Sequence, residues 1–198
     1  AVHYRNGEPF ELYHKSKMVP GVERMPFKKL LKFIDKIAID LGGTTGSLRY
    51  DKERKVFTNP KGNVTSAPVI CYESIYSRFV SDYITEGANL ITIITNDGWW
   101  KDTPGHRQHF EYARLRAIEN RTSVARSANT GISGFINQRG DVLQKTEYWV
   151  QDVIKAKVYA NPNPSFYARY KDYIANLSMF FSALLLLAFV SLKLRKKS

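Results

Sequence analysis

The feature that most constrains this chain is a stretch near its C-terminus, residues 174–192, in which 19 consecutive positions carry no charge. As a helix, a stretch of this length crosses the roughly 30 Å hydrocarbon core of a bilayer. Core helices of soluble domains rarely run this long without a charge, so we expect a transmembrane helix at 174–192. Four basic residues lie in the tail that follows, 193–198. By the positive-inside rule this tail is cytoplasmic, which places residues 1–170 on the other side of the membrane.

Aromatic residues also flank this stretch. Tyr167, Tyr170 and Tyr173 come just before it, where interfacial aromatic side chains are common. Arg169 and Lys171 lie among them and partly oppose the orientation that the tail indicates. At the other end, the first residues read as a strand and show no signal peptide. We therefore expect an earlier N-terminal part that carries the export signal.

The chain has 198 residues, a net charge of +12 and one cysteine. This length allows a single domain with an appendage, and one cysteine excludes a disulfide framework or a Cys-rich zinc module. His106 and His109 are spaced as a weak metal pair, but the sequence shows no third ligand. The positive charge suggests an anionic partner. Because Lys and Arg are scattered and no nucleic-acid-binding motif is recognisable, the sequence favours a membrane over nucleic acid.

Residues 1–170 read as alternating strands and helices, which predicts an α/β sandwich. The run 88–95 is apolar and rich in β-branched residues, as in a strand that is covered on both faces. A helix is expected at 74–86, with Ser74 as its N-cap and Gly87 after its end. The other expected elements are a helix at 106–120 and strands at 69–71, 123–128, 134–137, 142–144 and 152–158.

One further segment, residues 27–41, has apolar residues at helical spacing and lysines mostly on the opposite face. Gly42 and Gly43 end this run. A cationic amphipathic helix of this kind either lies in a membrane interface or packs on the core of its own domain. The sequence leaves both interpretations open. In the first, the helix would act as a lipid-facing lid.

Cys71 is predicted at the end of a buried strand, where the helical segment begins. Backbone N–H groups and the helix dipole favour a thiolate at such a position. Ligand sites in α/β sheets gather at the carboxyl ends of strands. A single cysteine is more often a small buried hydrophobic residue, but this strand-to-helix elbow favours a nucleophile. None of the four histidines lies in a recognisable protease setting: His3, His14, His106 and His109.

Five blocks resemble, in order and spacing, those of the nitrilase superfamily and more narrowly the bacterial apolipoprotein N-acyltransferases. They are residues 69–73, 95–100, 108–110, 113–119 and 126–131. Residues 13–20, with Glu23, resemble the lysine block of that family. The likeness covers residues 4–192. It implies a nitrilase-like α-β-β-α sandwich over 1–170, N-terminally incomplete, followed by one transmembrane helix.

The resemblance implies a catalytic set of Glu, Lys and Cys. Cys71 matches the nucleophile that carries the acyl group as a thioester, and Lys15 matches the lysine that stabilises the oxyanion. Lys17 is the rival lysine, although alignment on Tyr13 and on Val19 and Pro20 favours Lys15. Three further positions match supporting residues of the site: Glu23, Tyr72 and Glu73.

Three departures from the family accompany this match. The general-base glutamate lies several dozen residues before the lysine block in that family, so Glu8 and Glu11 are too close to Lys15 to take its place. The isolated chain is therefore expected to be inactive. The residues before Glu23, and the second tryptophan at Trp100, also differ from the family pattern, which bears on the details of lid and pocket.

The function implied by the resemblance is the transfer of an acyl chain from a membrane phospholipid to the N-terminal amino group of a lipidated apolipoprotein. It implies no metal or cofactor, and it places the protein in the bacterial inner membrane with the catalytic domain on the periplasmic side. Two alternatives stay open. One is a nitrilase-type amidase that acts on a small amide, and the other is a truncated, non-catalytic membrane homologue.

Overall fold

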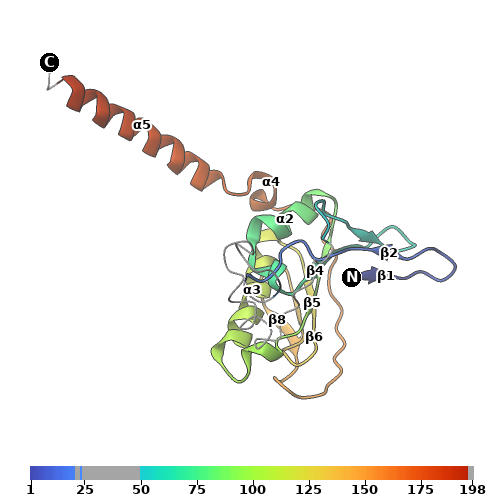
Figure 1. Cartoon of the computed structure of the whole chain (residues 1–198). Coiled ribbons are helices and arrows are strands. Elements are labelled where there is room, and N and C mark those ends of the chain that lie inside the picture. The colour runs from blue at the N-terminus through green and yellow to red at the C-terminus, as the bar shows by residue number, and fades with distance from the viewer. Residues whose placement is uncertain (21–22, 24–49, 196–198) are drawn as a thin grey trace.

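The structure, a computed structural model, describes residues 1–20, 23 and 50–195 (Figure 1). The amphipathic segment expected at 27–41 and the last part of the basic tail, 196–198, lie outside the described residues. Two parts are distinct in the cartoon: an α/β body and a single long helix that leads away from it.

The body is built on a six-stranded mixed sheet. Its strands are β3 (Phe57–Thr58), β4 (Thr65–Ile70), β5 (Leu90–Thr95), β6 (Val124–Ala128), β7 (Gly134–Ile136) and β8 (Val142–Lys145), and they lie in this order across the sheet. The central strands β4, β5 and β6 are parallel, and the outer strands pair antiparallel. A separate two-stranded ladder joins β1 (Val2–His3) to β2 (Glu11–Leu12).

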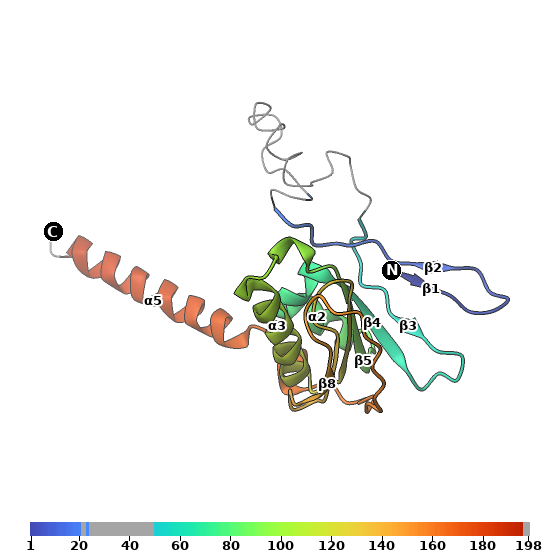
Figure 2. The same cartoon turned by 90° about the horizontal axis from the view of Figure 1, so that it is seen from below.

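Two helices connect the parallel strands: α2 (Ser77–Thr85) follows β4, and α3 (Pro104–Asn120) follows β5. Parallel neighbours are joined by right-handed crossovers, and both crossovers here step in the same direction along the sheet. Both helices therefore lie on one face, as Figure 2 shows. The core between them and the sheet includes Val69, Phe79, Val80, Tyr83, Ile91, Ile93, Ala113, Ala117 and Val124.

The opposite face of the sheet differs from the expectation for residues 88–95. Ile91 and Ile93 point to the helices and are buried, whereas Ile94, on the other face, is 50% exposed. Side chains alternate between the two faces of a strand, so this pattern marks one covered face. Among the described residues, the covering of both faces that the apolar run predicted is not seen.

The helix predicted at 74–86 begins differently in the structure. A 3₁₀ helix, η2 (Cys71–Ile75), comes first, and α2 starts only at Ser77. Ser74 is not an N-cap, because its hydroxyl donates to the carbonyl of Cys71 at 2.8 Å. The helix expected at 106–120 starts earlier, at Pro104, where Thr103 accepts from the N–H of Gly105.

The strand predicted at 152–158 is not formed among the described residues. Its alternation is present, since Val153 is 92% exposed and Ile154 is half-buried. The periodicity sets which side chains face inward, but a strand also needs a hydrogen-bonded neighbour, and the described part of the chain supplies none here. The remaining predicted strands all form, with shifted ends.

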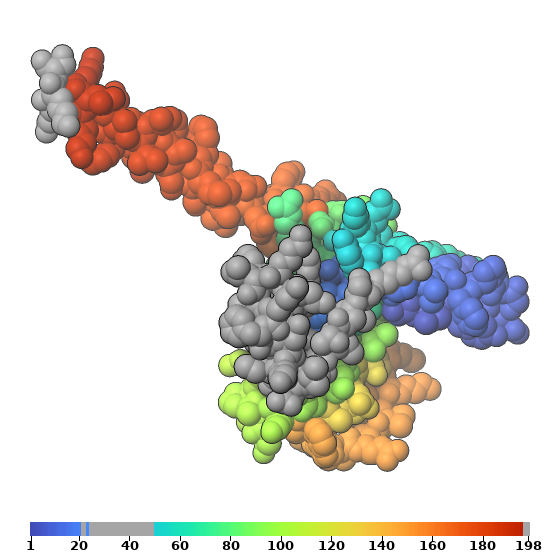
Figure 3. All heavy atoms as spheres, viewed as in Figure 1, coloured from blue at the N-terminus to red at the C-terminus, as the bar shows by residue number. Residues whose placement is uncertain are grey.

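The C-terminal part consists of two helices, α4 (Phe166–Tyr170) and α5 (Tyr173–Arg195). α5 has 23 residues, is apolar along most of its length, and none of its residues is buried. Figure 3 shows it standing clear of the body. A helix that is apolar all round belongs in a core or a membrane, and the described residues place no core around α5. By length and composition it can cross a membrane.

Candidate active site

Cys71 lies at the turn between β4 and η2 and is the first residue of η2. Its φ is +50°, in the left-handed region. For a residue with a side chain this conformation costs about 1–2 kcal/mol, and such strain gathers at functional sites. The residue is 9% exposed. The elbow predicted from the sequence is therefore present, in a sharper form than the pattern alone implied.

A cavity of about 340 Å³ opens beside Cys71. Its walls are mainly apolar and aromatic: Val19, Tyr72, Ile75, Trp99, Trp100 and Tyr112, with Gly105, Gln108 and His109 completing them. Trp99 and Trp100 come from a second short 3₁₀ helix, η3 (Gly98–Trp100), which follows β5. Concave apolar sites with few polar groups are typical of ligand pockets. The cavity gives an apolar group access to the region of the thiol.

Glu73 joins the elbow to the lysine block. Its carboxylate is fully buried and accepts from the Tyr13 hydroxyl at 2.7 Å and from the backbone N–H groups of Ser16 and Lys17 at 2.5 and 3.3 Å. Its second oxygen accepts from the Ile70 N–H at 2.8 Å. Burial raises the pKa of Glu73 above its ordinary value, and these hydrogen bonds oppose that rise. One carboxylate thus holds residues 13–17 against the strand that leads into Cys71.

The two candidate lysines have different surroundings. Lys15 Nζ donates to both carboxylate oxygens of Glu23, at 2.7 and 2.6 Å. Glu23 also accepts from the backbone N–H of Val19 at 2.8 Å, which fixes its position. Lys17 Nζ lies instead over the ring of Tyr76, 5.5 Å from its centroid. Lys15 is therefore the lysine that an acidic partner holds in place.

A buried polar network of Asp97, His109 and Arg126 lies next to the elbow, and no role for these residues was predicted from the sequence. Asp97 Oδ1 lies 2.8 Å from His109 Nδ1, and Asp97 Oδ2 accepts from Arg126 at 2.5 Å. His109 Nε2 lies 3.0 Å from the Ser74 hydroxyl and 3.3 Å from the carbonyl oxygen of Cys71. This network reaches the backbone of the candidate nucleophile.

The charges of this network are compensated inside the core. Asp97 is fully buried and the side chain of Arg126 has no exposed area. Burial alone would raise the pKa of Asp97, but the hydrogen bond with His109 and the charge of Arg126 outweigh it and hold that pKa below its ordinary value. The Asp97 carboxylate is thus ionised at neutral pH, as a partner for the buried guanidinium.

His106 and His109 do not act together. His106 stacks on Tyr148, with ring centroids 3.8 Å apart, while His109 belongs to the network around Asp97. Among the described residues no group of three or more His, Cys, Asp or Glu side chains could hold a metal ion.

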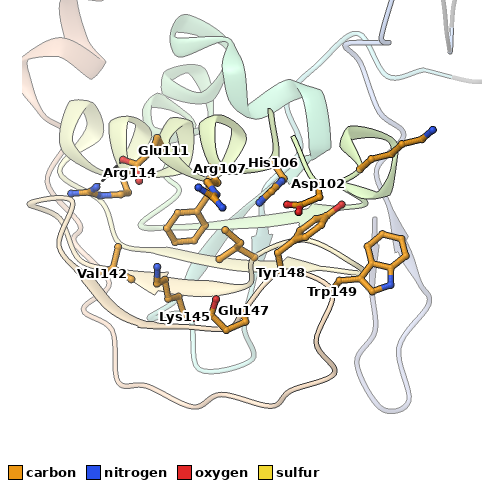
Figure 4. Close-up of a pocket in the computed structure, with 13 residues that line it drawn as sticks. Asp102, His106, Arg107, Glu111, Arg114, Val142, Lys145, Glu147, Tyr148 and Trp149 are labelled. Carbon is orange, nitrogen blue, oxygen red and sulfur yellow. Dashed lines mark hydrogen bonds and ion pairs between the residues drawn. The ribbon is translucent and has the colours of Figure 1, made fainter. Parts of the chain in front are cut away.

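A second, larger hollow of about 930 Å³ lies between α3 and β8. Figure 4 shows Arg107, Glu111 and Arg114 on the helical side, with Val142 and Lys145 on the opposite side. Neither Cys71 nor Lys15 borders this hollow. The site with the candidate nucleophile is the smaller, apolar cavity.

The family model described as carbon-nitrogen hydrolase matches residues 3–161. The chain belongs to the carbon-nitrogen hydrolase family. Curated relatives of this carbon-nitrogen hydrolase chain carry the name apolipoprotein N-acyltransferase. The protein from Chlorobaculum tepidum is 35% identical over 176 residues, which cover 87% of this chain and 33% of that protein. The protein from Rickettsia typhi is 34% identical over 191 residues, which cover 93% and 36%.

Among solved structures, an amidase from Nesterenkonia sp. overlaps with 67% of this chain and 50% of its own, at 15% identity and a TM-score of 0.46. This carbon-nitrogen hydrolase chain spans about a third of the length of the curated relatives that it matches. The resemblance to apolipoprotein N-acyltransferases is confirmed by those relatives, as is the nitrilase-like α/β fold.

The residues of the buried network of this carbon-nitrogen hydrolase could be located in its sequence, although their contacts could not. Asp97, His109 and Arg126 each lie in one of the blocks that carry the family resemblance. Nothing in their spacing shows that they meet, because 12 and 29 residues separate Asp97 from its two partners. The pairing of β5 with β6 brings Asp97 and Arg126 together, and His109 joins them from α3.

Proposed function

We propose that this chain contributes the nucleophile of an enzyme that transfers an acyl chain from a membrane phospholipid to the N-terminal amino group of a lipidated apolipoprotein. The observation that carries the proposal is the placement of Cys71, a thiol at a strained turn beside an apolar cavity. The name of the relatives, apolipoprotein N-acyltransferase, supports acyl transfer to an amino group of an apolipoprotein. The exposed apolar helix α5 supports a site that works on lipids.

The first step forms a thioester. Cys71 Sγ, as the thiolate, attacks the ester carbonyl carbon of the phospholipid, and a C–S bond forms as the C–O bond to the glycerol breaks. A general base accepts the thiol proton and passes it to the leaving glycerol oxygen, which departs as the lysophospholipid. The apolar walls beside Cys71 suit the acyl chain that remains.

The second step forms the amide. The neutral α-amino group of the apolipoprotein attacks the thioester carbonyl, so a C–N bond forms and the C–S bond breaks. The amine proton passes through the same base to the Cys71 sulfur. The thiol is regenerated, and one acyl group has moved from oxygen to nitrogen.

Lys15 is proposed to stabilise the oxyanion of both tetrahedral intermediates. An ammonium group has three donors, and Glu23 engages two of them. Among the described residues no other acceptor engages the third, which we assign to the developing negative charge, where a fixed cation in a site that excludes water has its largest effect. Glu23 acts here as a positioning residue for Lys15.

Tyr72 and Glu73 are proposed to support the same site in different ways. Tyr72 lines the cavity and packs edge-to-face on Tyr76, with ring centroids 5.4 Å apart. Glu73 keeps the lysine loop beside the elbow through its buried hydrogen bonds. Neither residue needs to exchange a proton in this scheme.

The general base is expected to be a glutamate outside the residues of this chain. Glu8 and Glu11 both pair with Arg5, at 2.8 and 2.7 Å, in the ladder of β1 and β2. These carboxylates are already engaged in ion pairs, which supports the expectation that they do not take that role. We accordingly expect the chain by itself to lack turnover.

The membrane arrangement completes the proposal. α5 would cross the bacterial inner membrane and leave the basic tail in the cytoplasm, with the catalytic domain on the periplasmic side. Both substrates are anchored in the same bilayer, which accounts for an anchor on a fold that is shared with amidases.

The proposal is tested with the natural protein in phospholipid vesicles that also contain a diacylglyceryl-cysteine lipopeptide. We expect an N-acylated lipopeptide and an equimolar amount of lysophospholipid, both of which disappear in Cys71→Ala. Hydrolysis of small soluble amides without acyl transfer would contradict the proposal and favour an amidase. A folded natural protein with neither activity would favour a non-catalytic homologue.

A further inference from the structure

The short helix α4 has two chemically different faces. Ala168 is fully buried against the body and Tyr167 is half-buried. On the opposite face Phe166 and Tyr170 are 62% and 59% exposed. Tyr167 therefore faces inward, although the sequence predicted it among the interfacial aromatic residues. Phe166 faces outward in its place.

The outward side chains form one aromatic patch, which we define as Phe166, Tyr170 and Tyr173. The ring centroids of Phe166 and Tyr170 are 4.6 Å apart, and those of Phe166 and Tyr173 are 5.4 Å apart at an interplanar angle of 87°. Tyr173 is also the first residue of α5. The patch is thus continuous with the apolar surface of the long helix.

The inward side chains fasten α4 to α2. Tyr167 and Ser77 share a hydrogen bond of 2.7 Å between their hydroxyl groups, and Lys171 donates to Asp82 at 2.5 Å. The Ser165 hydroxyl caps α4 by accepting from the Ala168 N–H at 3.0 Å. These contacts act on both ends of a helix of only five residues. They hold α4 and Lys171 against the body, directly before α5 begins at Tyr173.

The same contacts continue toward the elbow. Ser77 also donates to Glu119 at 2.6 Å, and Glu119 pairs with Arg116 at 3.0 Å. Arg116 in turn donates to the carbonyl of Ile75, the last residue of η2, at 3.2 Å. A continuous series of polar contacts therefore joins α4 to η2, the element that begins at Cys71.

We propose that the aromatic patch docks in the headgroup zone of a phospholipid bilayer, and that the inward contacts of α4 thereby hold the catalytic body at a fixed orientation to the membrane. Aromatic rings with a polar tip concentrate at this depth. Arg169, exposed between the aromatic residues, adds a charge that is complementary to lipid phosphates. The proposal rests on the membrane anchoring in the proposed function, but on none of its chemistry.

The test uses the absence of other cysteines in the chain. In the full chain carrying Cys71→Ser, one spin label is attached at a time to Phe166→Cys, Tyr170→Cys, Leu185→Cys or Arg139→Cys. The last is a control in the turn between β7 and β8, where the native side chain is 83% exposed. Accessibility to oxygen and to a water-soluble nickel complex is then measured in phosphatidylcholine–phosphatidylglycerol vesicles.

We expect a lipid-like ratio of oxygen to nickel accessibility at 185, a water-like ratio at 139, and intermediate ratios at 166 and 170. Water-like ratios at 166 and 170, with a lipid-like ratio at 185, would overturn the docking surface and leave the anchor intact. A water-like ratio at 185 would overturn both. Because the background lacks the nucleophile, none of these results depends on catalysis.

A second measurement tests the inward contacts. Tyr167→Phe combined with Lys171→Met should increase the mobility of a label at 170, seen as narrower spectral lines. Lys157→Met, an exposed lysine away from α4, is the matched control and should leave the lines unchanged. Equal mobility in all three proteins would show that these contacts do not fix α4.

Discussion

At Cys71 the backbone takes a left-handed conformation that glycine adopts freely and other residues do not. Its neighbours determine this conformation: Ser74 and His109 both approach the Cys71 carbonyl, and Glu73 holds the preceding N–H of Ile70. A nucleophile at such a turn is held away from the strand and toward the cavity. The strain is therefore part of the site and should be measurable.

Replacing the thiol in two ways isolates that strain. Cys71→Gly and Cys71→Ala both remove the sulfur, but only glycine relieves the left-handed backbone. We expect the glycine variant to exceed the alanine variant by about 1 kcal/mol in free energy of unfolding. Urea unfolding in detergent measures this difference. An alanine variant that is equal or more stable would mean that the turn is unstrained.

The two lysines offer a matched pair for catalysis. Lys15→Met removes the proposed oxyanion donor and should lower acyl transfer in the natural protein by about 10²–10³-fold. Lys17→Met removes a lysine of equal charge that lies over Tyr76, and it should leave most of the activity. Rates of lipopeptide acylation in vesicles compare them. A larger loss from Lys17→Met would reassign the role.

Asp97 offers the sharpest test of the buried network. Asp97→Asn leaves the Arg126 guanidinium buried without a counter-charge, which should cost about 3–5 kcal/mol of stability. Asp141→Asn, which removes a carboxylate paired with exposed Arg139, should change stability little. Chemical denaturation followed by near-UV circular dichroism measures both. Similar losses in the two variants would mean that Arg126 finds another partner.

At the scale of elements, periodicity predicted most of the sheet, because β5, β6, β7 and β8 each carry local alternation or an apolar run. The stretch 152–158 has the same alternation and yet forms no ladder in the described part of the chain, since pairing depends on a neighbour that the local pattern does not specify. The predicted start of α2 was wrong for a related reason. The Ser74 hydroxyl serves the Cys71 carbonyl rather than a helix end.

In the candidate site, too, local features could be predicted and contacts between distant segments could not. The turn after β4 could be predicted, because a buried strand followed by a helical pattern places Cys71 there. The pairing of Lys15 with Glu23, eight residues apart, agrees with the family pattern. The meeting of Asp97 with Arg126 could not be predicted, because it depends on β5 and β6 being neighbours in the sheet.

The two helix caps predict a difference in stability at this scale. Ser165 is buried and its hydroxyl both caps α4 and donates to the Glu119 carbonyl at 2.5 Å. The Thr103 hydroxyl caps α3 through a long contact of 3.4 Å and donates to the Trp100 carbonyl at 2.6 Å, and both contacts are exposed. We expect Ser165→Ala to cost about 1–2 kcal/mol in free energy of unfolding, and Thr103→Ala to cost less. The reverse order would mean that α4 is not held by its cap.

At the scale of the whole molecule, the apolar helix and the basic residues at its end have a common explanation. Lys193 and Arg195 lie in the last turn of α5, and basic residues there favour the cytoplasmic side of a membrane. The opposite end of α5 is tied to the catalytic body through α4. In the proposed arrangement, the carbon-nitrogen hydrolase domain lies beside substrates that are themselves anchored in the bilayer.

The central claim is that Cys71 carries the acyl group, and the most direct measurement is mass spectrometry of that residue. The natural protein is incubated in vesicles with phospholipid but no acceptor. We predict a mass increase of one acyl chain on the peptide containing Cys71, removed by neutral hydroxylamine and absent from Cys71→Ala. A protein that transfers acyl chains without this adduct, or that keeps transferring them as Cys71→Ala, would contradict the account.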